Sequence, residues 1–196
     1  MAAWIWIFII LAGGLFGLKI VYILSTVLVL PITQGALYVS TSRIKIAAFI
    51  DAVPMKADHM LVDLGCGDGR VLREAWKRYG IRTIGYEINP LAYLKARLFS
   101  LGCSKIKIKR QNFWEADLSG ADVVFCYLYP DVMKKLAAKL GSGLKPGAIV
   151  VSSNFPLPGY IPDRVLRPES SLHNDPMYVY QIGSENSGPK NPRGNR

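Results

Sequence analysis

The stretch VDLGCGDGRVL, residues 62–72, carries glycines at alternating positions, Gly65, Gly67 and Gly69. It follows an apolar, strand-like run and precedes a segment with apolar residues at helical spacing. In an open α/β sheet the turn after the first strand lies against the ligand, and glycines allow the backbone to approach that ligand closely. The spacing therefore predicts a ligand-binding turn.

The sequence of this turn argues against two common phosphate sites. A dinucleotide-binding turn needs its third glycine where Arg70 stands, and a P-loop needs a lysine and a hydroxyl after its last glycine. Asp63 and Asp68 would also repel a pyrophosphate. A cationic ligand without phosphate fits better. S-adenosylmethionine has this chemistry, because it carries a sulfonium, an ammonium and two ribose hydroxyls.

Two further positions match a nucleoside ligand. Glu87 lies twenty positions beyond Gly67 at the end of the second predicted strand, where a carboxylate can accept both ribose hydroxyls. Asn112 and Phe113 follow the third strand, where Asn112 could bond the amino edge of an adenine and Phe113 could stack on its ring. The alternative is that this loop is only capped by Asn112 and that the aromatic side chains belong to the core. The predicted cofactor is S-adenosylmethionine, bound by Asp63, Gly65, Gly67, Gly69, Glu87, Asn112 and Phe113.

Strand-like and helix-like segments alternate from residue 42 to residue 182. Strands are predicted at 60–64, 81–87, 105–110, 120–129 and 146–153, with a closing hairpin formed by 164–166 and 177–182. Helices are predicted at 42–53, 70–79, 89–102 and 130–140. This order indicates the α/β class: a doubly wound, mostly parallel seven-stranded sheet, Rossmann-like, in one domain over residues 37–183. A polar tail, 184–196, is expected to be disordered.

The first 36 residues form a separate hydrophobic segment, predicted to be a membrane anchor. Residues 2–18 carry no charge, and after Lys19 the next charge is Arg43. One tilted transmembrane helix is favoured over a short hairpin loosened by Gly13, Gly14 and Gly17, a cleaved signal peptide or a buried core helix. Basic residues after the segment predict that the folded domain lies on the cytoplasmic side. A bacterial or archaeal cell membrane is expected rather than the mitochondrial inner membrane.

Composition adds three expectations. The three cysteines are far apart and only two histidines exist, so no metal site is predicted and the thiols are expected to be reduced. The net charge of +10 suits an anionic membrane surface or a nucleic acid. Lys105, Lys107 and Lys109 alternate with isoleucines, which is typical of an edge strand protected against aggregation, so no nucleic acid partner is expected.

These motifs resemble a known family. DLGCGDGR at 63–70, YEINP at 86–90 and the end of the fourth strand resemble class I S-adenosylmethionine-dependent methyltransferases. More narrowly, YVST at 38–41, GYEINP at 85–90 and NFPLP at 154–158 are similar to the membrane-anchored lysine methyltransferases of the ATP synthase c subunit and the adenine nucleotide translocase. The sequence departs from that pattern at Asn112 and at Tyr127–Leu128.

The resemblance implies methyl transfer to a membrane-associated acceptor, above all a lysine of an integral membrane protein. A lipid-soluble small molecule and a non-catalytic cofactor-binding module are the alternatives. The loop 127–131 faces the transferring methyl group in this fold, so Tyr127 and Tyr129 could contact the amine and Asp131 could accept a proton. Asp131 could equally help to cap the helix that follows it.

Overall fold

The structure is a computed structural model that describes residues 2–33, 41–168 and 175–183. Its centre is one seven-stranded sheet with the order β3-β2-β1-β4-β5-β7-β6. The strands are β1 (Met60–Leu64), β2 (Arg82–Tyr86), β3 (Ile106–Lys109), β4 (Val123–Cys126), β5 (Ile149–Ser153), β6 (Arg164–Leu166) and β7 (Met177–Gln181). The first five are parallel, and β7 runs antiparallel between β5 and β6. The predicted sheet and its closing hairpin are confirmed.

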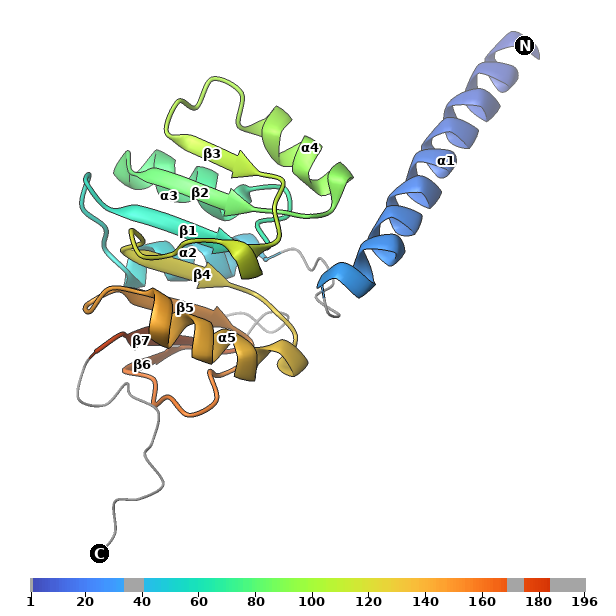
Figure 1. Cartoon of the computed structure of the whole chain (residues 1–196). Helices are drawn as coiled ribbons and strands as arrows, with labels where there is room; N and C mark the ends of the chain where they lie inside the picture. The colour runs from blue at the N-terminus through green and yellow to red at the C-terminus, as the bar shows by residue number, and fades with distance from the viewer. Residues whose placement is uncertain (1, 34–40, 169–174, 184–196) are drawn as a thin grey trace, which may run out of the picture.

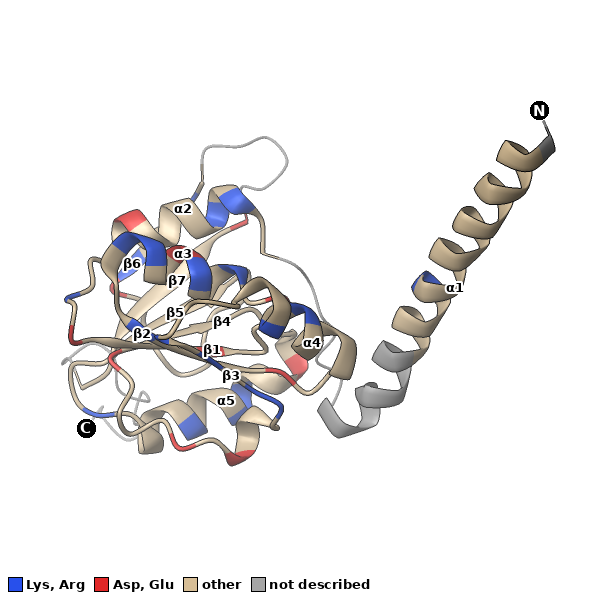
Figure 2. Ribbon diagram, turned by 90° about the horizontal axis from the view of Figure 1, so that it is seen from above, with Lys and Arg blue, Asp and Glu red and all other residues tan. Residues whose placement is uncertain are grey.

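Helices cover both faces of the sheet (Figures 1 and 2). One face carries α2 (Arg43–Ala52), α3 (Arg70–Tyr79) and α4 (Pro90–Phe99), whereas the other carries α5 (Pro130–Gly143) and the short 3-10 helix η1 (Phe113–Glu115). Each face buries its own apolar cluster, centred on Phe49 and Leu72 on one side and on Val124 and Leu136 on the other. The predicted helix start at Asn89 is confirmed, because its side chain accepts hydrogen bonds from two amides of the first turn of α4.

Strand β3 occupies one edge of the sheet, as its alternating lysines predicted. Lys105 and Lys107 are exposed, whereas Ile108 is buried. The lysines therefore face solvent at the edge, where their charge opposes pairing with another strand.

The amino-terminal segment is one continuous helix, α1 (Ala2–Thr33), so the hairpin alternative is wrong. Residues Ala3–Leu24 have a mean hydropathy of 2.4, and none of this stretch is buried against the protein. The alternative interpretation of the segment as a buried core helix is therefore also wrong. By length and composition α1 qualifies as one membrane span. The predicted domain boundary at residue 37 and the predicted disordered tail, 184–196, lie outside the described residues.

Gly85 in β2 provides a test of this packing. A Cβ atom at this position would lie 2.5 Å from both Cys66 Sγ and Leu72 Cδ1. We therefore expect Gly85→Ala to destabilise the fold by about 1–3 kcal/mol through overpacking, lowering the melting temperature of the full chain in detergent. Gly143→Ala is the matched control, because a Cβ atom at the end of α5 would meet nothing within 4 Å. Equal melting temperatures for the two variants would contradict the close packing at Gly85.

Candidate functional site

The glycine turn connects β1 to α3 at the carboxyl edge of the sheet. Gly65, Gly67 and Gly69 have φ values of 82°, 56° and 75°, in the left-handed region that favours glycine. The amides of Gly65 and Cys66 both donate to the carbonyl oxygen of Tyr86 at 3.0 Å, which ties the turn to the end of β2. The turn therefore closes tightly beside the neighbouring strand.

Glu87 lies against this turn, as its spacing predicted. Its side chain is buried, with Oε2 accepting from the amide of Gly67 at 2.9 Å and Oε1 accepting from the amide of Asn89 at 2.7 Å. Burial raises the pKa of the Glu87 carboxyl, although the hydrogen bonds from the amides of Asn89, Gly67 and Ile88 oppose that rise. Each carboxylate oxygen has a further lone pair, so the group retains capacity to accept ligand hydroxyls.

Asp63 is a second buried carboxylate at the end of β1. It is 4% exposed, and no hydrogen bond or ion pair to its side chain is found among the described residues. Burial raises its pKa well above the usual value, and the charges of Glu87 and Asp68 raise it further. Burying a carboxylate without a partner is costly. A cationic ligand would supply the missing compensation, so the residues present fit S-adenosylmethionine.

Asp68 has a different role from the one predicted. Its carboxylate forms a bidentate pair with Arg70, from Nε to Oδ1 at 2.9 Å and from Nη2 to Oδ2 at 2.7 Å. Burial raises the pKa of Asp68, but the hydrogen bonds and charge of Arg70 outweigh it, and the pKa is lowered overall. Its charge is therefore compensated within the protein. Of the two aspartates that were expected to repel a phosphate, Asp63 is the one without a partner among the described residues.

Arg70 also connects the turn to the segment that leads into α2. Its Nη1 donates to the carbonyl oxygen of Thr41 at 3.2 Å, and Thr41 is buried. Arg70, which stands where a dinucleotide motif has its third glycine, thus links the glycine turn to the segment before α2.

Asn112 and Phe113 lie in the loop after β3, where the sequence placed them. The Asn112 side-chain oxygen accepts from the amide of Trp114 at 3.1 Å and caps η1. Phe113 is buried and packs against the Trp114 ring with 4.7 Å between centroids. Both features match the capped-loop alternative, so their contact with adenine stays a prediction.

A cluster of which the sequence indicated only Tyr127 lies beyond the carboxyl ends of β4 and β5. Lys45 of α2 is 3% exposed, and its Nζ donates to Asn154 Oδ1 and to Asp175 Oδ2, the latter at 3.3 Å. The same Nζ lies 5.6 Å from the centroid of the Tyr127 ring. Asn154 Nδ2 donates to the Tyr127 hydroxyl at 3.0 Å. We call these residues, Lys45, Tyr127, Asn154 and Asp175, the amine cluster.

One signal for this cluster was present in the sequence, and a second is visible in the backbone of the structure. Lys45 sits one helical turn before Phe49, on the face of α2 that is buried. Asn154 comes directly after β5, and its φ of 71° makes it the one non-glycine residue with positive φ in the described chain. Strained residues of this kind gather at functional sites. Burial raises the pKa of the Tyr127 hydroxyl, and Asp175 and Tyr129 add to the rise, so this phenol is neutral at physiological pH.

The predicted catalytic candidates lie next to this cluster along the chain. Tyr129 is half-buried at the position that precedes α5, and Asp131 is exposed in the first turn of that helix. A carboxylate in the first helical turn interacts favourably with the helix dipole. A catalytic role for either residue stays a prediction.

Comparisons with known proteins agree with this site. A family model described as the ANTKMT methyltransferase domain matches residues 63–164. The protein-lysine N-methyltransferase of Saccharolobus islandicus (strain REY15A) is 34% identical over 150 residues, which are 74% of this chain and 93% of that protein. The adenine nucleotide translocase lysine N-methyltransferase of Mus musculus is 37% identical over 133 residues, 66% of this chain and 55% of that protein. The chain therefore spans about half the length of the mouse relative.

A solved structure is also similar. The RNA methyltransferase from Salinibacter ruber in complex with S-adenosyl-L-homocysteine superimposes with a TM-score of 0.70 at 33% identity, covering 75% of this chain and 95% of that one. The resemblance predicted from the motifs is confirmed.

The raised pKa of Asp63 predicts how cofactor binding depends on pH. An aspartate with a raised pKa takes up its proton at a higher pH than the ordinary value of about 3.9, and the neutral acid no longer attracts a cation. Affinity for S-adenosylmethionine in calorimetric titrations should therefore fall as the pH is lowered through the raised pKa of Asp63. Asp63→Asn should bind about tenfold more weakly at high pH and lose most of this pH dependence. Uncharged adenosine is the control ligand, and an equally steep pH profile for it would overturn the role of Asp63.

Proposed function

The chain belongs to the family of the ANTKMT methyltransferase domain and is an S-adenosylmethionine-dependent methyltransferase, and from this premise we propose that it methylates a lysine side chain of an integral membrane protein. The observation that carries the proposal is the amine cluster. Its groups, a neutral phenol, a carboxamide oxygen and a carboxylate, are those that hold an alkylammonium, and they already hold that of Lys45. The names of the archaeal and mouse relatives, both lysine methyltransferases, support the same acceptor.

The cofactor supplies the methyl group as part of a sulfonium cation. In the proposed site, Asp63 faces the positive charge of the cofactor, and Glu87 accepts the ribose hydroxyls while it holds the glycine turn through Gly67. Asn112 and Phe113 are proposed to border the adenine. Together these residues fix the cofactor at the carboxyl edge of β1 and β2.

The acceptor lysine must lose a proton before its nitrogen can attack. At pH 7 this costs about 4–5 kcal/mol for an amine with a pKa near 10.4. Removing the acceptor amine from water in a dry site offsets part of this cost, because burial disfavours the charged form. The Lys45 ammonium is paired with Asp175, so its charge is compensated within the protein. We assign Lys45 the role of positioning Asn154 and, through it, the Tyr127 hydroxyl, and we assign Tyr127 the role of bonding the neutral acceptor amine.

The arrangement of α1 supports a membrane-bound acceptor. The parallel strands point their carboxyl ends toward the side of the molecule on which α1 stands (Figure 1). Arg43, Lys45 and Lys56 follow the apolar helix, which favours the cytoplasmic side for the catalytic domain. An enzyme anchored beside its acceptor works at a raised local concentration of that acceptor.

The proposal predicts which fraction receives the methyl group. Membranes from cells that lack the enzyme are incubated with the full chain and methyl-radiolabelled cofactor, and label should enter delipidated protein as methyllysine, identified by mass spectrometry. Glu87→Ala is the control that should transfer no label, because the cofactor site loses its central carboxylate. Label confined to the organic extract would indicate a lipid-soluble acceptor, and label confined to RNA would indicate a nucleic acid; either result would sink the lysine assignment.

Tyr127→Phe tests the amine cluster directly. The substitution keeps the ring beside Lys45 and removes the hydroxyl that accepts from Asn154. We expect kcat to fall about tenfold while the cofactor dissociation constant changes less than about twofold, since the lost interaction concerns the acceptor. Tyr129→Phe is measured in parallel. If Tyr129→Phe lost the activity and Tyr127→Phe kept it, the acceptor would be bonded at Tyr129 instead.

A further inference from the structure

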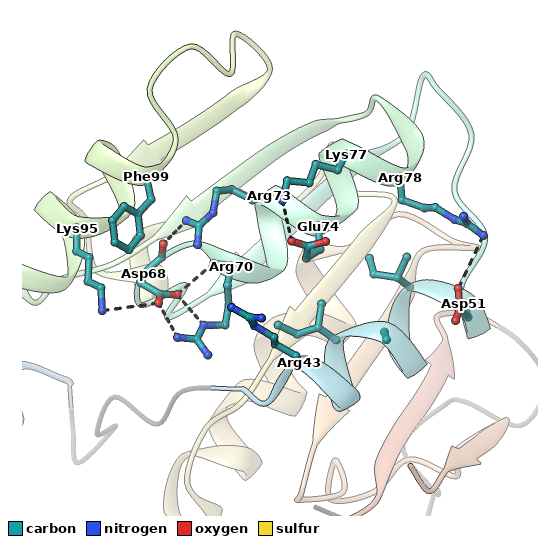
Figure 3. Close-up of a pocket in the computed structure, with 13 residues that line it drawn as sticks. Arg43, Asp51, Asp68, Arg70, Arg73, Glu74, Lys77, Arg78, Lys95 and Phe99 are labelled. Carbon is teal, nitrogen blue, oxygen red and sulfur yellow. Dashed lines mark hydrogen bonds and ion pairs between the residues drawn. The ribbon is translucent and has the colours of Figure 1, made fainter. Parts of the chain in front are cut away.

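A basic cavity of about 930 Å³ lies between α2, α3 and α4 (Figure 3). None of the predicted cofactor residues lines it, whereas Asp68 and Arg70 of the glycine turn do, so the cavity lies beside the methyl-transfer site. Its charged lining comprises the basic residues Arg43, Arg70, Arg73, Lys77, Arg78 and Lys95 and the acidic residues Asp51, Asp68 and Glu74. The formal excess is three positive charges.

The cations of this cavity are unequally compensated. Arg70 pairs with Asp68 at 2.7 Å and Lys77 pairs with Glu74 at 3.1 Å. Arg43 and Arg73 have no carboxylate within ion-pair distance among the described residues. Arg73 instead donates to a backbone carbonyl oxygen, and its guanidinium lies 5.3 Å from the centroid of the Phe99 ring. Two guanidinium groups therefore remain available to an anion.

An exposed apolar surface borders the cavity. Leu94 and Leu98 of α4 and Leu101 just beyond it are 52%, 55% and 71% exposed, at the spacing of one helical stripe. We call these three residues the leucine stripe. Phe99 is 55% exposed and also lines the cavity, so it joins the two surfaces. Helix α4 in turn contacts α1, the candidate membrane span, and lies on the α1 side of the domain in both overall views.

We propose that this face of the domain docks onto an anionic phospholipid surface. Lipid phosphates enter the basic cavity, where Arg43 and Arg73 meet them, and the leucine stripe inserts among the headgroups. A lipid surface satisfies both parts of the face, because it presents negative charge and apolar chains together. A nucleic acid would meet the guanidinium groups but leave the leucines in water. The proposal rests on α1 crossing the membrane, which is part of the proposed function.

Cys103 offers a natural reporter at this face. It is two residues beyond Leu101 and half-buried, whereas burial raises the pKa of Cys66 and raises that of Cys126 to about 12, so neither of those thiols competes for an alkylating label. The full chain, labelled at Cys103 with an environment-sensitive fluorophore, is reconstituted in phosphatidylcholine bilayers with or without phosphatidylglycerol. Resistance to alkaline carbonate extraction establishes separately that α1 is inserted.

We expect quenching by headgroup-linked nitroxide lipids to rise about twofold when phosphatidylglycerol is present, and to return to the lower level at high salt. The variant Arg43→Gln/Arg73→Gln/Lys95→Gln removes the excess charge of the cavity, including both available guanidinium groups, and should lose the rise. The control Lys56→Gln/Arg82→Gln/Lys134→Gln removes the same charge elsewhere and should keep it. Leu98→Ser should lower quenching in both bilayers.

Three results would overturn the proposal: equal quenching in both bilayers, a rise that survives in the cavity variant, or a rise that the control loses as well. Fluorescently labelled RNA is titrated in the neutral bilayers as a second probe. RNA binding that disappears in the cavity variant, without any response to phosphatidylglycerol, would make the face a nucleic acid site. Because the reporter requires no methyl transfer, these outcomes are independent of the acceptor assignment, and failed carbonate resistance would count against the anchor itself.

Discussion

The buried carboxylate of Glu87 fixes the geometry on which the site depends. One oxygen holds the amide of Gly67 in the turn after β1, and the other holds the amide of Asn89, the residue that caps α4 after β2. A single side chain thus sets the start of α4 relative to the glycine turn that leads into α3. Burial raises the pKa values of Glu87 and Asp63, and the charge of Glu87 adds to the rise at Asp63. Burying two carboxylates costs free energy of folding, which a bound cation would offset.

The parts of this fold that could be read from the sequence are those set by local chemistry. Strand β1 ends at the glycine turn, Asn89 with Pro90 starts a helix, and lysines alternating with isoleucines identify the edge strand β3. The distance of twenty residues from Gly67 to Glu87 was informative because a βαβ unit brings the ends of its two strands together. The sequence predicted the fold correctly where one residue type meets a requirement of the local backbone, such as a glycine in a tight turn or an asparagine at the start of a helix.

The remainder depends on side-chain pairs that no local pattern specifies. Asp68 was interpreted as a free negative charge, but the first turn of α3 points Arg70 back onto it. Asn112, which was predicted to bond the adenine, caps η1 with its side-chain amide oxygen. Lys45 and Asn154 are 109 residues apart and meet only because α2 packs near the ends of β4 and β5. Partner choice of this kind follows from tertiary packing.

The length of α1 has a consequence for which lysines the proposed anchored enzyme can reach. Thirty-two helical residues extend about 48 Å at 1.5 Å per residue, whereas the hydrocarbon core is about 30 Å thick. An upright span would leave several helical turns in the headgroup region or beyond it. The catalytic edge would then lie at a fixed height above the bilayer. The enzyme would select acceptor lysines by their distance from the membrane surface as much as by the residues that flank them.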